Sequence, residues 1–584
     1  MKYRQLLLLS AAAAIAASCV KVNGGLGENF IATSQQYHIE TVDFPLTETR
    51  MEMSDSLSGF SNSRIVIGAI RDGVFGVTTR AAAMSLIPAL DTIDLGRNPV
   101  VRRFRFSVSA DSVSIPREKE RYILQNVNVY SLVNPINYDK VGTTQDLEHS
   151  AARVNLGTPV VNGSDSLTFE FTEEFAMQYV NGIKSLAPDG VLIDRAGHTD
   201  ADDESVLAEY LQDRLRKYCS VMPGIYIDTD VPESDGGRIN IFDLSCLSWL
   251  SDGTYSGYFR NNNYAVLYLN SEYDGERKDT SFLFIPGEAE FFDENSYLSK
   301  KSKFYQYSLN ITGHEKSKAM EGVAGDFIYV EGGGGVKPVV QASELRSKLL
   351  AHIASKGLDP SKAIISKATL EMPFEAPDDY LDFSVFPVML SPTCRIEAES
   401  GKVTFAGLSD ASSSNENQGD INRSTLMYSP DITHHLQELL RLEDTGKIHN
   451  YDVWFLTVFN EIVESTGNNS GYDTDYYRNL LYAQYYNQLY NGYGYGYPYG
   501  GYGGYGYGGY GYGYGGYGYG YDSYGYGYSN YLNYALMQSM YSSSSSTVQK
   551  AMTLDKDRYY KVALNGPSSA RPPVLRVTYC IPKE

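Results

Sequence analysis

The stretch Phe104-Arg105-Phe106-Ser107-Val108-Ser109 alternates apolar and polar side chains over six consecutive residues. Successive side chains of a β-strand point to opposite faces of the sheet, so this alternation predicts a strand with one face in a core and the other in water. The same alternation recurs along the chain, at 167–171, 305–311, 370–374 and 575–581. Strands that bury only one face are typical of antiparallel sheets.

Helical spacing is rare beside these strands. The clearest helix is predicted after Thr172, where apolar residues recur every four positions up to Ile183. Strands and helices do not alternate regularly, which argues against a parallel sheet. A chain of 584 residues also exceeds what one core can hold. The sequence therefore predicts a mainly-β protein with two antiparallel β-sandwich (jelly-roll-like) domains, at 55–300 and 301–584, and a few short helices.

The first eighteen residues have the composition of a secretory signal. A short basic start precedes an apolar run of twelve residues at 6–17, which is too short to span a bilayer as a helix. The run closes with Ala16-Ala17-Ser18-Cys19, and small residues followed directly by a cysteine are typical of bacterial lipoproteins. We predict a lipoprotein signal peptide at 1–18, lipidation of Cys19, and a lipidated tether with an entry strand at 19–54. Ordinary secretion, with Cys19 incidental, is the alternative.

The net charge limits the classes of partner that the chain can bind, and the spacing of its cysteines limits the kinds of metal or redox site that it can form. The formal net charge of −21 repels nucleic acid and anionic headgroups alike. Membrane attachment is therefore expected through the N-terminal lipid, and nucleic acid is not expected as a partner. No two of the later cysteines have the CxxC spacing of a zinc or redox site. Outside the cytoplasm they can form disulfides in three pairings or stay reduced and buried; they are Cys219, Cys246, Cys394 and Cys580.

A low-complexity insert at 470–546 interrupts the second predicted domain. Its centre, 492–528, contains 18 Gly and 16 Tyr among 37 residues. Glycine loses the most entropy on ordering and supplies no core, so the insert is expected to be disordered. Tyrosine combines an aromatic face with a hydroxyl, which makes such arrays adhesive. The predicted partner contacts are Tyr493, Tyr502, Tyr510, Tyr517 and Tyr526. The alternative is an expanded loop without a role.

Motifs of catalysis and of cofactor binding are missing from the sequence. The chain has no HExxH and no G-x-S-x-G. The glycine run 332–335 is not followed by the Lys-Ser/Thr of a phosphate-binding loop, so we interpret it as a hairpin turn. Two stretches offer oxygens to calcium without the spacing of a known calcium loop, and solvated turns are the simpler interpretation. Their residues are Asp228, Asp230 and Asp235, and Asn415, Asn417 and Asp420. We therefore expect no catalytic, cofactor-binding or metal-binding residues.

Several stretches, taken in this order, resemble a lipoprotein family of the Bacteroidetes, domain of unknown function 4270. They are 63–68 (Ser-Arg-Ile-Val-Ile-Gly), 72–78 (Asp-Gly-Val-Phe-Gly-Val-Thr), 223–227, 322–340, 364–374 and 573–579. The resemblance implies an outer-membrane lipoprotein, on the cell surface or on the periplasmic leaflet, and brings no activity or catalytic residue with it. We favour the surface. A further similarity of 368–370 and 426–440 to jelly-roll domains found beside carbohydrate-active enzymes concerns the fold alone.

Together these observations predict a non-enzymatic outer-membrane lipoprotein that binds a ligand or partner at the cell envelope. One alternative is a glycan-binding module of a polysaccharide-uptake system, which the sandwich fold and the many tyrosines favour. The other is an adhesion or envelope-assembly component, which the insert favours. An exposed groove lined by tyrosine or tryptophan would favour the glycan-binding module.

Overall fold

The computed structural model describes residues 36–464 and 548–582, with gaps at 55–56, 58, 62–63, 112–119, 121, 138–146, 162–165, 195–203, 245–246, 250–254, 259–262, 287–288, 291–302, 305–307, 398–402, 409 and 411–416. Cys19, Cys246, Asn415 and the insert with its five predicted contact tyrosines lie outside the described residues. The described strands pair in antiparallel sheets and far outnumber the helices, which confirms the predicted mainly-β, sandwich-like fold.

The first unit is built on one large sheet of fourteen strands. Its main order is β10-β8-β12-β5-β4-β13-β7-β16-β17-β6. Outside this order, β9 pairs with β8, β11 with β7, and β20 with β5 and β3. The strands are β3 (Phe60–Ser61), β4 (Arg64–Asp72), β5 (Gly76–Met84), β6 (Ile87–Pro88), β7 (Arg97–Ala110), β8 (Gln125–Leu132), β9 (His149–Arg153), β10 (Val160–Val161), β11 (Leu167–Glu170), β12 (Ile225–Thr229), β13 (Gly236–Asp243), β16 (Tyr264–Tyr273), β17 (Glu276–Ile285) and β20 (Ser308–His314). Two further strand pairs are β14 (Leu247–Trp249) with β15 (Tyr255–Tyr258), and β18 (Ala289–Glu290) with β19 (Lys303–Phe304).

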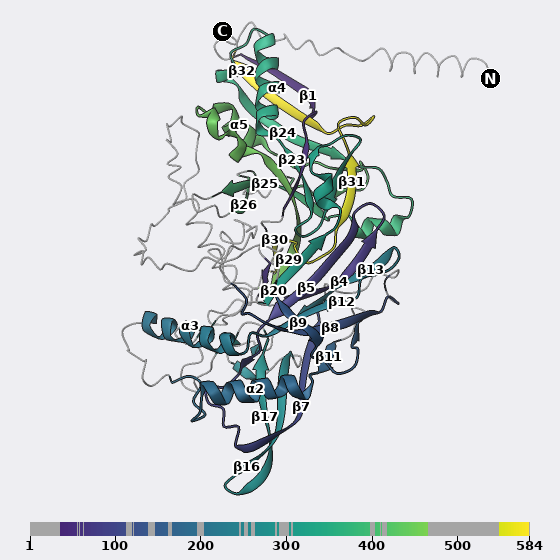
Figure 1. Cartoon of the computed structure of the whole chain (residues 1–584). Coiled ribbons are helices and arrows are strands. Elements are labelled where there is room, and N and C mark those ends of the chain that lie inside the picture. The colour runs from purple at the N-terminus through teal and green to yellow at the C-terminus, as the bar shows by residue number, and fades with distance from the viewer. Residues whose placement is uncertain are drawn as a thin grey trace, which may run out of the picture.

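Two helices, α2 (Glu173–Leu186) and α3 (Glu204–Val221), contribute to the core of the first unit (Figure 1). The alternating stretch lies in β7, where Phe104, Phe106 and Val108 are buried as predicted. Phe104 contacts Tyr179 of α2 edge to face, with ring centroids 5.3 Å apart. Thr172 caps α2 by accepting a hydrogen bond from the backbone of residue 175, which confirms the predicted helix start.

The second unit combines three sheets. A five-stranded sheet has the order β1-β32-β24-β28-β27, a seven-stranded sheet has the order β21-β2-β23-β29-β25-β26 with β30 paired to β29, and β22 pairs with β31. The strands are β1 (Tyr37–Pro45), β2 (Arg50–Met53), β21 (Gly322–Val323), β22 (Phe327–Glu331), β23 (Val336–Val340), β24 (Ile364–Pro373), β25 (Met389–Glu397), β26 (Val403–Gly407), β27 (Ile421–Asn422), β28 (Met427–Tyr428), β29 (Val453–Glu464), β30 (Val548–Leu554), β31 (Lys561–Asn565) and β32 (Val574–Pro582). Its helices are α4 (Ala342–Ser355) and α5 (Thr433–Arg441), with 3-10 turns η7 (Ser317–Met320), η8 (Pro360–Lys362), η9 (Tyr380–Val385) and η11 (Thr445–Tyr451).

Strand pairing divides the chain differently from the predicted domain boundaries. The entry strand predicted within 19–54 is present as β1, and it belongs to the second unit, because it pairs along its whole length with β32, from Tyr37 opposite Pro582 to Pro45 opposite Val574. Strand β20, placed by the sequence in the second domain, pairs with β5 of the first unit. The physical reason is that antiparallel pairing is not restricted to strands joined by a hairpin, and residue order does not reveal the distant partners. No helix in the described ranges is long and apolar enough to cross a membrane.

The two units meet at the turn between β4 and β5. Phe75 of this turn is buried in the hydrophobic core of the second unit, and its ring lies edge to face with Tyr329 of β22 at 5.9 Å. Lys561 of β31 contacts the carboxylate of Asp72 across the same boundary. The first unit is therefore docked through specific side chains, both apolar and charged.

Candidate functional site

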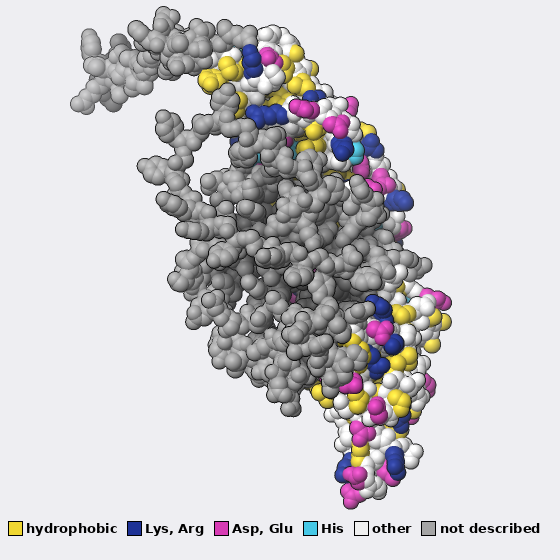
Figure 2. Space-filling model, turned by 90° about the vertical axis from the view of Figure 1, so that its left-hand side faces the viewer, with side chains coloured by type: hydrophobic (Ala, Val, Ile, Leu, Met, Phe, Trp, Pro, Cys, Tyr) yellow, Lys and Arg dark blue, Asp and Glu magenta, His cyan; other side chains and the backbone are white. Residues whose placement is uncertain are grey.

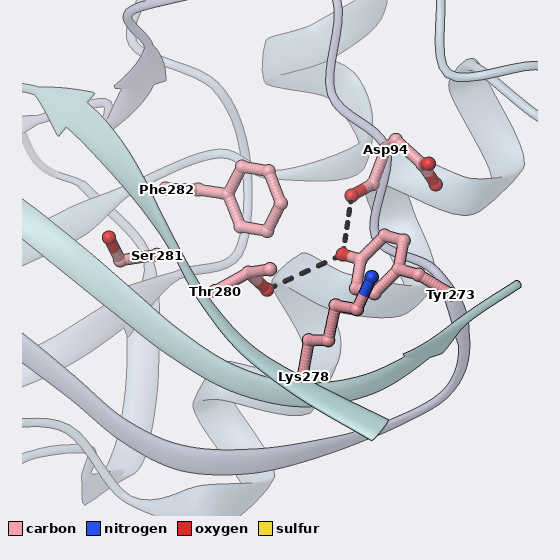
Figure 3. Close-up of a pocket in the computed structure, with 6 residues that line it drawn as sticks. All are labelled: Asp94, Tyr273, Lys278, Thr280, Ser281 and Phe282. Atoms are coloured by element: carbon pink, nitrogen blue, oxygen red, sulfur yellow. Dashed lines mark hydrogen bonds between the residues drawn. The ribbon is translucent and has the colours of Figure 1, made fainter. Parts of the chain in front are cut away.

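An open hollow of about 520 Å³ lies on the first unit, between the β16–β17 hairpin and the segment that joins β6 to β7 (Figure 3). We call it the distal pocket. It is lined by Asp94, Tyr273, Lys278, Thr280, Ser281 and Phe282. Figure 3 shows the rings of Tyr273 and Phe282 on either side of Thr280.

The hairpin places these side chains through a tight turn and a strict register. Asp274 and Gly275 connect β16 to β17 and both have positive φ, 53° and 82°, as a two-residue hairpin turn of type I′ requires. Beyond the turn, Lys278, Thr280 and Phe282 occupy alternate positions of β17 and so share one face. The pocket thus presents a cation, a hydroxyl and an aromatic ring in one row.

Tyr273 is fixed at the edge of the pocket by the segment before β7. Its hydroxyl donates a hydrogen bond to the backbone oxygen of Asp94 at 2.8 Å and lies 3.4 Å from the hydroxyl of Thr280. Gly96 makes this approach possible, because a Cβ there would lie 2.8 Å from Cζ of Tyr273 and its φ is +65°. The ring is therefore held in place before any ligand arrives, which lowers the entropic cost of binding.

The chemistry of the distal pocket suits binding. Ring faces beside hydroxyl, ammonium and carboxylate groups fit a ligand with an apolar face and several hydrogen-bonding groups. Within the described ranges, no group of three His, Cys, Asp or Glu side chains is placed to hold a metal ion. The pocket was not predicted from the sequence. Asp274-Gly275 is a local signal of a turn, but no local pattern indicates that Asp94 lies beside this hairpin.

A second group of charged side chains lies buried where the two units meet. We call Arg80, His314, Glu331 and Lys337 the junction cluster. Arg80 is 3% exposed, Glu331 and Lys337 are 0% exposed, and the side chain of His314 is 2% exposed. Arg80 and His314 belong to the first unit, whereas Glu331 and Lys337 belong to the second. The cluster therefore joins the units with charges that water does not reach.

Glu331 is the acceptor at the centre of this cluster. Its Oε1 accepts a hydrogen bond from the hydroxyl of Thr78 at 2.5 Å, and its Oε2 lies 3.0 Å from Nδ1 of His314. Burial raises the pKa of Glu331, but these contacts outweigh burial and leave the pKa below its ordinary value. Burial also lowers the pKa of His314, which favours its neutral form.

Lys337 organises the glycine run 332–335, which the sequence predicts to be a hairpin turn. Its Nζ donates to the backbone oxygens of Glu331, Gly333 and Gly335, the latter two at 2.9 and 3.0 Å. Burial lowers the pKa of Lys337 to about 7, whereas three carbonyl acceptors favour the ammonium form. Gly333 has φ +59°, and a Cβ there would lie 2.1 Å from Nη2 of Arg80. Gly333 and Gly335 therefore allow the backbone to pass close to the buried charges of Arg80 and Glu331.

The acidic residues considered for calcium are engaged in protein contacts. The amide of Asn128 donates to Asp228 and Asp230 at 3.0 and 3.1 Å, and Asp230 also accepts from Asn126 at 2.8 Å. Asp235 is exposed beyond this group. In the other stretch, Oδ1 of Asn417 accepts from the backbone of residues 419 and 420, which is a turn as expected.

A buried histidine and three cysteines lie outside both the distal pocket and the junction cluster. His435 is buried and its Nε2 lies 2.9 Å from the backbone oxygen of Tyr451. Cys219, Cys394 and Cys580 are free thiols. Comparison of the chain with models of known protein families, with curated proteins and with solved structures found no match in any of the three.

Proposed function

We propose that this chain is a lipid-anchored protein of a bacterial outer membrane that binds a ligand without converting it chemically. The observation that supports this proposal most is that strands β1 and β32 and the distal pocket lie at opposite ends of the molecule in Figure 1. Strands β1 and β32, the first and last described strands, lie at one end, and β16 and β17, which contribute most of the residues of the distal pocket, lie at the other. A lipid on Cys19 would hold the first end at the bilayer and leave the pocket facing away from it.

The length of the intervening chain is compatible with this arrangement. Seventeen residues separate Cys19 from Tyr37, the first residue of β1. Such a segment reaches at most about 60 Å when extended and about 25 Å on average as a flexible chain. The second unit would therefore stay close to the membrane.

A glycan is the ligand class that the distal pocket favours. Tyr273 and Phe282 offer ring faces, and Asp94, Lys278 and Thr280 offer hydrogen-bonding groups around them. Sugars combine an apolar face with hydroxyls and so match both features. The adhesion role of the insert, through Tyr493 and the other four tyrosines, stays a prediction.

Metabolic labelling with a lipid analogue tests the anchor. Wild-type protein expressed with its signal should incorporate the analogue and sediment with membranes, whereas Cys19→Ser should do neither. Cys580→Ser, which changes another partly exposed cysteine, should behave as wild type and serves as the matched control. An unlabelled wild-type protein would overturn the lipoprotein proposal.

A panel of immobilised polysaccharides tests the ligand. Tyr273→Ala should lose at least tenfold in affinity for any polysaccharide that the wild type binds, because the fixed ring is removed. Tyr268→Ala is the control, since Tyr268 is 40% exposed on the same hairpin but is not a lining residue of the pocket. If both variants lose the same affinity, or if neither substitution changes the affinity, the ligand binds outside the distal pocket.

A further inference from the structure

The outer face of the five-stranded sheet carries an exposed apolar row at one end. Ile39 of β1 and Ile364 of β24 both lie opposite Cys580 of β32, so the three side chains form one row across three strands. Tyr37 of β1 stands beside this row, opposite Pro582. Ile39 is 68% exposed, Tyr37 48% and Ile364 45%, which is unusual for large apolar side chains in neighbouring positions. We call these five residues the apolar row.

The same face becomes polar along the strands. Two residues beyond Ile39, the hydroxyls of Thr41 and Thr578 are 2.9 Å apart. Two residues further, Arg576 forms ion pairs with Asp43 of β1 at 2.8 Å and with Glu371 of β24 at 2.6 Å. The polarity of this face is therefore graded, from apolar at the start of β1 to charged at its end.

The register that exposes the apolar row is fixed by the opposite face of β1. There, Glu40 accepts a hydrogen bond from the hydroxyl of Tyr579 at 2.7 Å and pairs with Lys356, the residue directly after α4, at 3.0 Å. Phe44 is buried and contacts the ring of His352 edge to face at 5.5 Å. A shift by one residue would break these contacts, so β1 cannot turn its apolar side chains inward.

The apolar end of the gradient is also where the chain enters from the N-terminal segment. Tyr37 is the first residue of β1, eighteen positions after Cys19. Figure 2 keeps the vertical direction of Figure 1 and shows hydrophobic side chains gathered among the described atoms at the upper end, where β1 and β32 lie. Tyrosine and aliphatic side chains are suited to the boundary between headgroups and acyl chains, and a chain of net charge −21 has no general attraction to anionic lipid.

We propose that the apolar row rests on the bilayer surface when the chain is anchored, with the Asp43–Arg576–Glu371 ion pairs held in water. This inference rests on the proposed lipid anchor, which keeps the row within reach of the membrane at high effective concentration. Contact of the row would orient the protein, so that the distal pocket points away from the bilayer instead of sampling all directions.

A fluorescent label on the native thiol of Cys580 tests the proposal. The protein would carry Cys246→Ala and Cys394→Ala, and its N-terminal segment up to residue 35 would be replaced by a histidine tag bound to a nickel-chelating lipid in phosphatidylcholine vesicles. This tether makes the test independent of natural lipidation, so that its failure is distinguishable from failure of the anchor. The matched control carries Cys580→Ser and Glu371→Cys, which moves the label to the charged end of the same face.

Nitroxide lipids in the vesicles should quench the label at Cys580 at least threefold more than the label at position 371. The double substitution of Ile39→Ser with Ile364→Ser should remove most of this difference while circular dichroism stays unchanged. Equal quenching at the two positions, in protein that sediments with the vesicles, would overturn the proposal. Two other results would also overturn the proposal. If iodide cannot quench the label at Cys580 in the absence of vesicles, a segment of the chain covers the apolar row. If sedimentation equilibrium shows a dimer that the double substitution dissociates, a second copy of the chain covers it.

Discussion

The junction cluster and the distal pocket contain the same kinds of charged side chain and differ in burial. Lys337 of the junction is 0% exposed and donates to three backbone carbonyls, whereas the side chain of Lys278 in the pocket is 53% exposed. Glu331 is enclosed by partners from both units, whereas Asp94 is exposed. Buried charges with fixed partners serve the fold, because removing one partner leaves the other uncompensated. Exposed groups of the same type stay available to a ligand.

The largest effect is expected from Glu331→Ala. This substitution removes a buried negative charge beside Arg80 and Lys337 and the oxygen that faces Nδ1 of neutral His314, and it should lower the free energy of unfolding by about 3–5 kcal/mol. Urea denaturation followed by circular dichroism measures the loss. Glu276→Ala is the control, because the Glu276 side chain is 80% exposed at the hairpin turn, and its substitution should cost less than about 0.5 kcal/mol. Similar losses in the two variants would refute the contrast between the regions.

A smaller but clear effect is expected from Gly333→Ala. The new Cβ would collide with the guanidinium of Arg80, and φ of +59° is unfavourable for alanine. We expect a loss of about 2–3 kcal/mol in the free energy of unfolding. Gly325→Ala is matched to it, since a Cβ at Gly325 meets nothing within 4 Å. A stable Gly333→Ala variant would show that the glycine run is not required for closure.

Acid should weaken the junction through two groups. The pKa of His314 lies below its ordinary value of 6.5, so the unfolded chain binds the extra proton first and stability falls as pH drops below about 6.5. The pKa of Glu331 lies below its ordinary 4.5, so its contribution is present above that pH and is lost as pH falls further. His314→Gln should flatten the dependence between pH 7 and 5 by up to about 1.4 kcal/mol per pH unit. An unchanged slope in His314→Gln would assign the pH dependence of stability to other groups.

The positions of strands along the chain could be predicted from the sequence better than the distant segments that each element contacts. Alternation at Phe104 and at Leu575 was enough to place β7 and β32, because the period of side chains along a strand is local. The start of α4 depends on such a distant partner, because the backbone N–H of Ala342 donates a hydrogen bond to Oδ1 of Asp452 at 2.8 Å. That carboxylate is 110 residues away, so no local pattern could reveal it.

The candidate site was less predictable for the same reason. Tyr273 and Asp94 are 179 residues apart and meet only because β16 and β7 are neighbours in the sheet. The glycine run 332–335 was recognised as a turn, whereas its role around Lys337 depends on Arg80 from another unit. Reading residues in order gives periodicity and turns, and long-range contacts have to come from the structure.

The smallest effect on stability is expected in the pocket. Tyr273→Phe removes the hydrogen bond to Asp94 and should cost about 0.5–1.5 kcal/mol in the free energy of unfolding, with the fold intact. Differential scanning fluorimetry measures the shift against Tyr268→Phe, whose exposed ring should make its substitution neutral. A loss in Tyr273→Phe as large as that in Glu331→Ala would mean that the pocket, too, is part of the core.

The most direct test of the contrast is hydrogen exchange of the native full-length protein, followed by mass spectrometry of peptides covering 331–337 and 276–282. Amides of the first peptide, including that of Val336, which donates to the buried hydroxyl of Ser317 at 2.6 Å, should exchange only when the whole protein unfolds. Amides of the second peptide, on β17, should exchange orders of magnitude faster through local opening. Equal protection of the two peptides, or faster exchange at 331–337, would contradict the assignment of the junction cluster to the fold and of the distal pocket to binding.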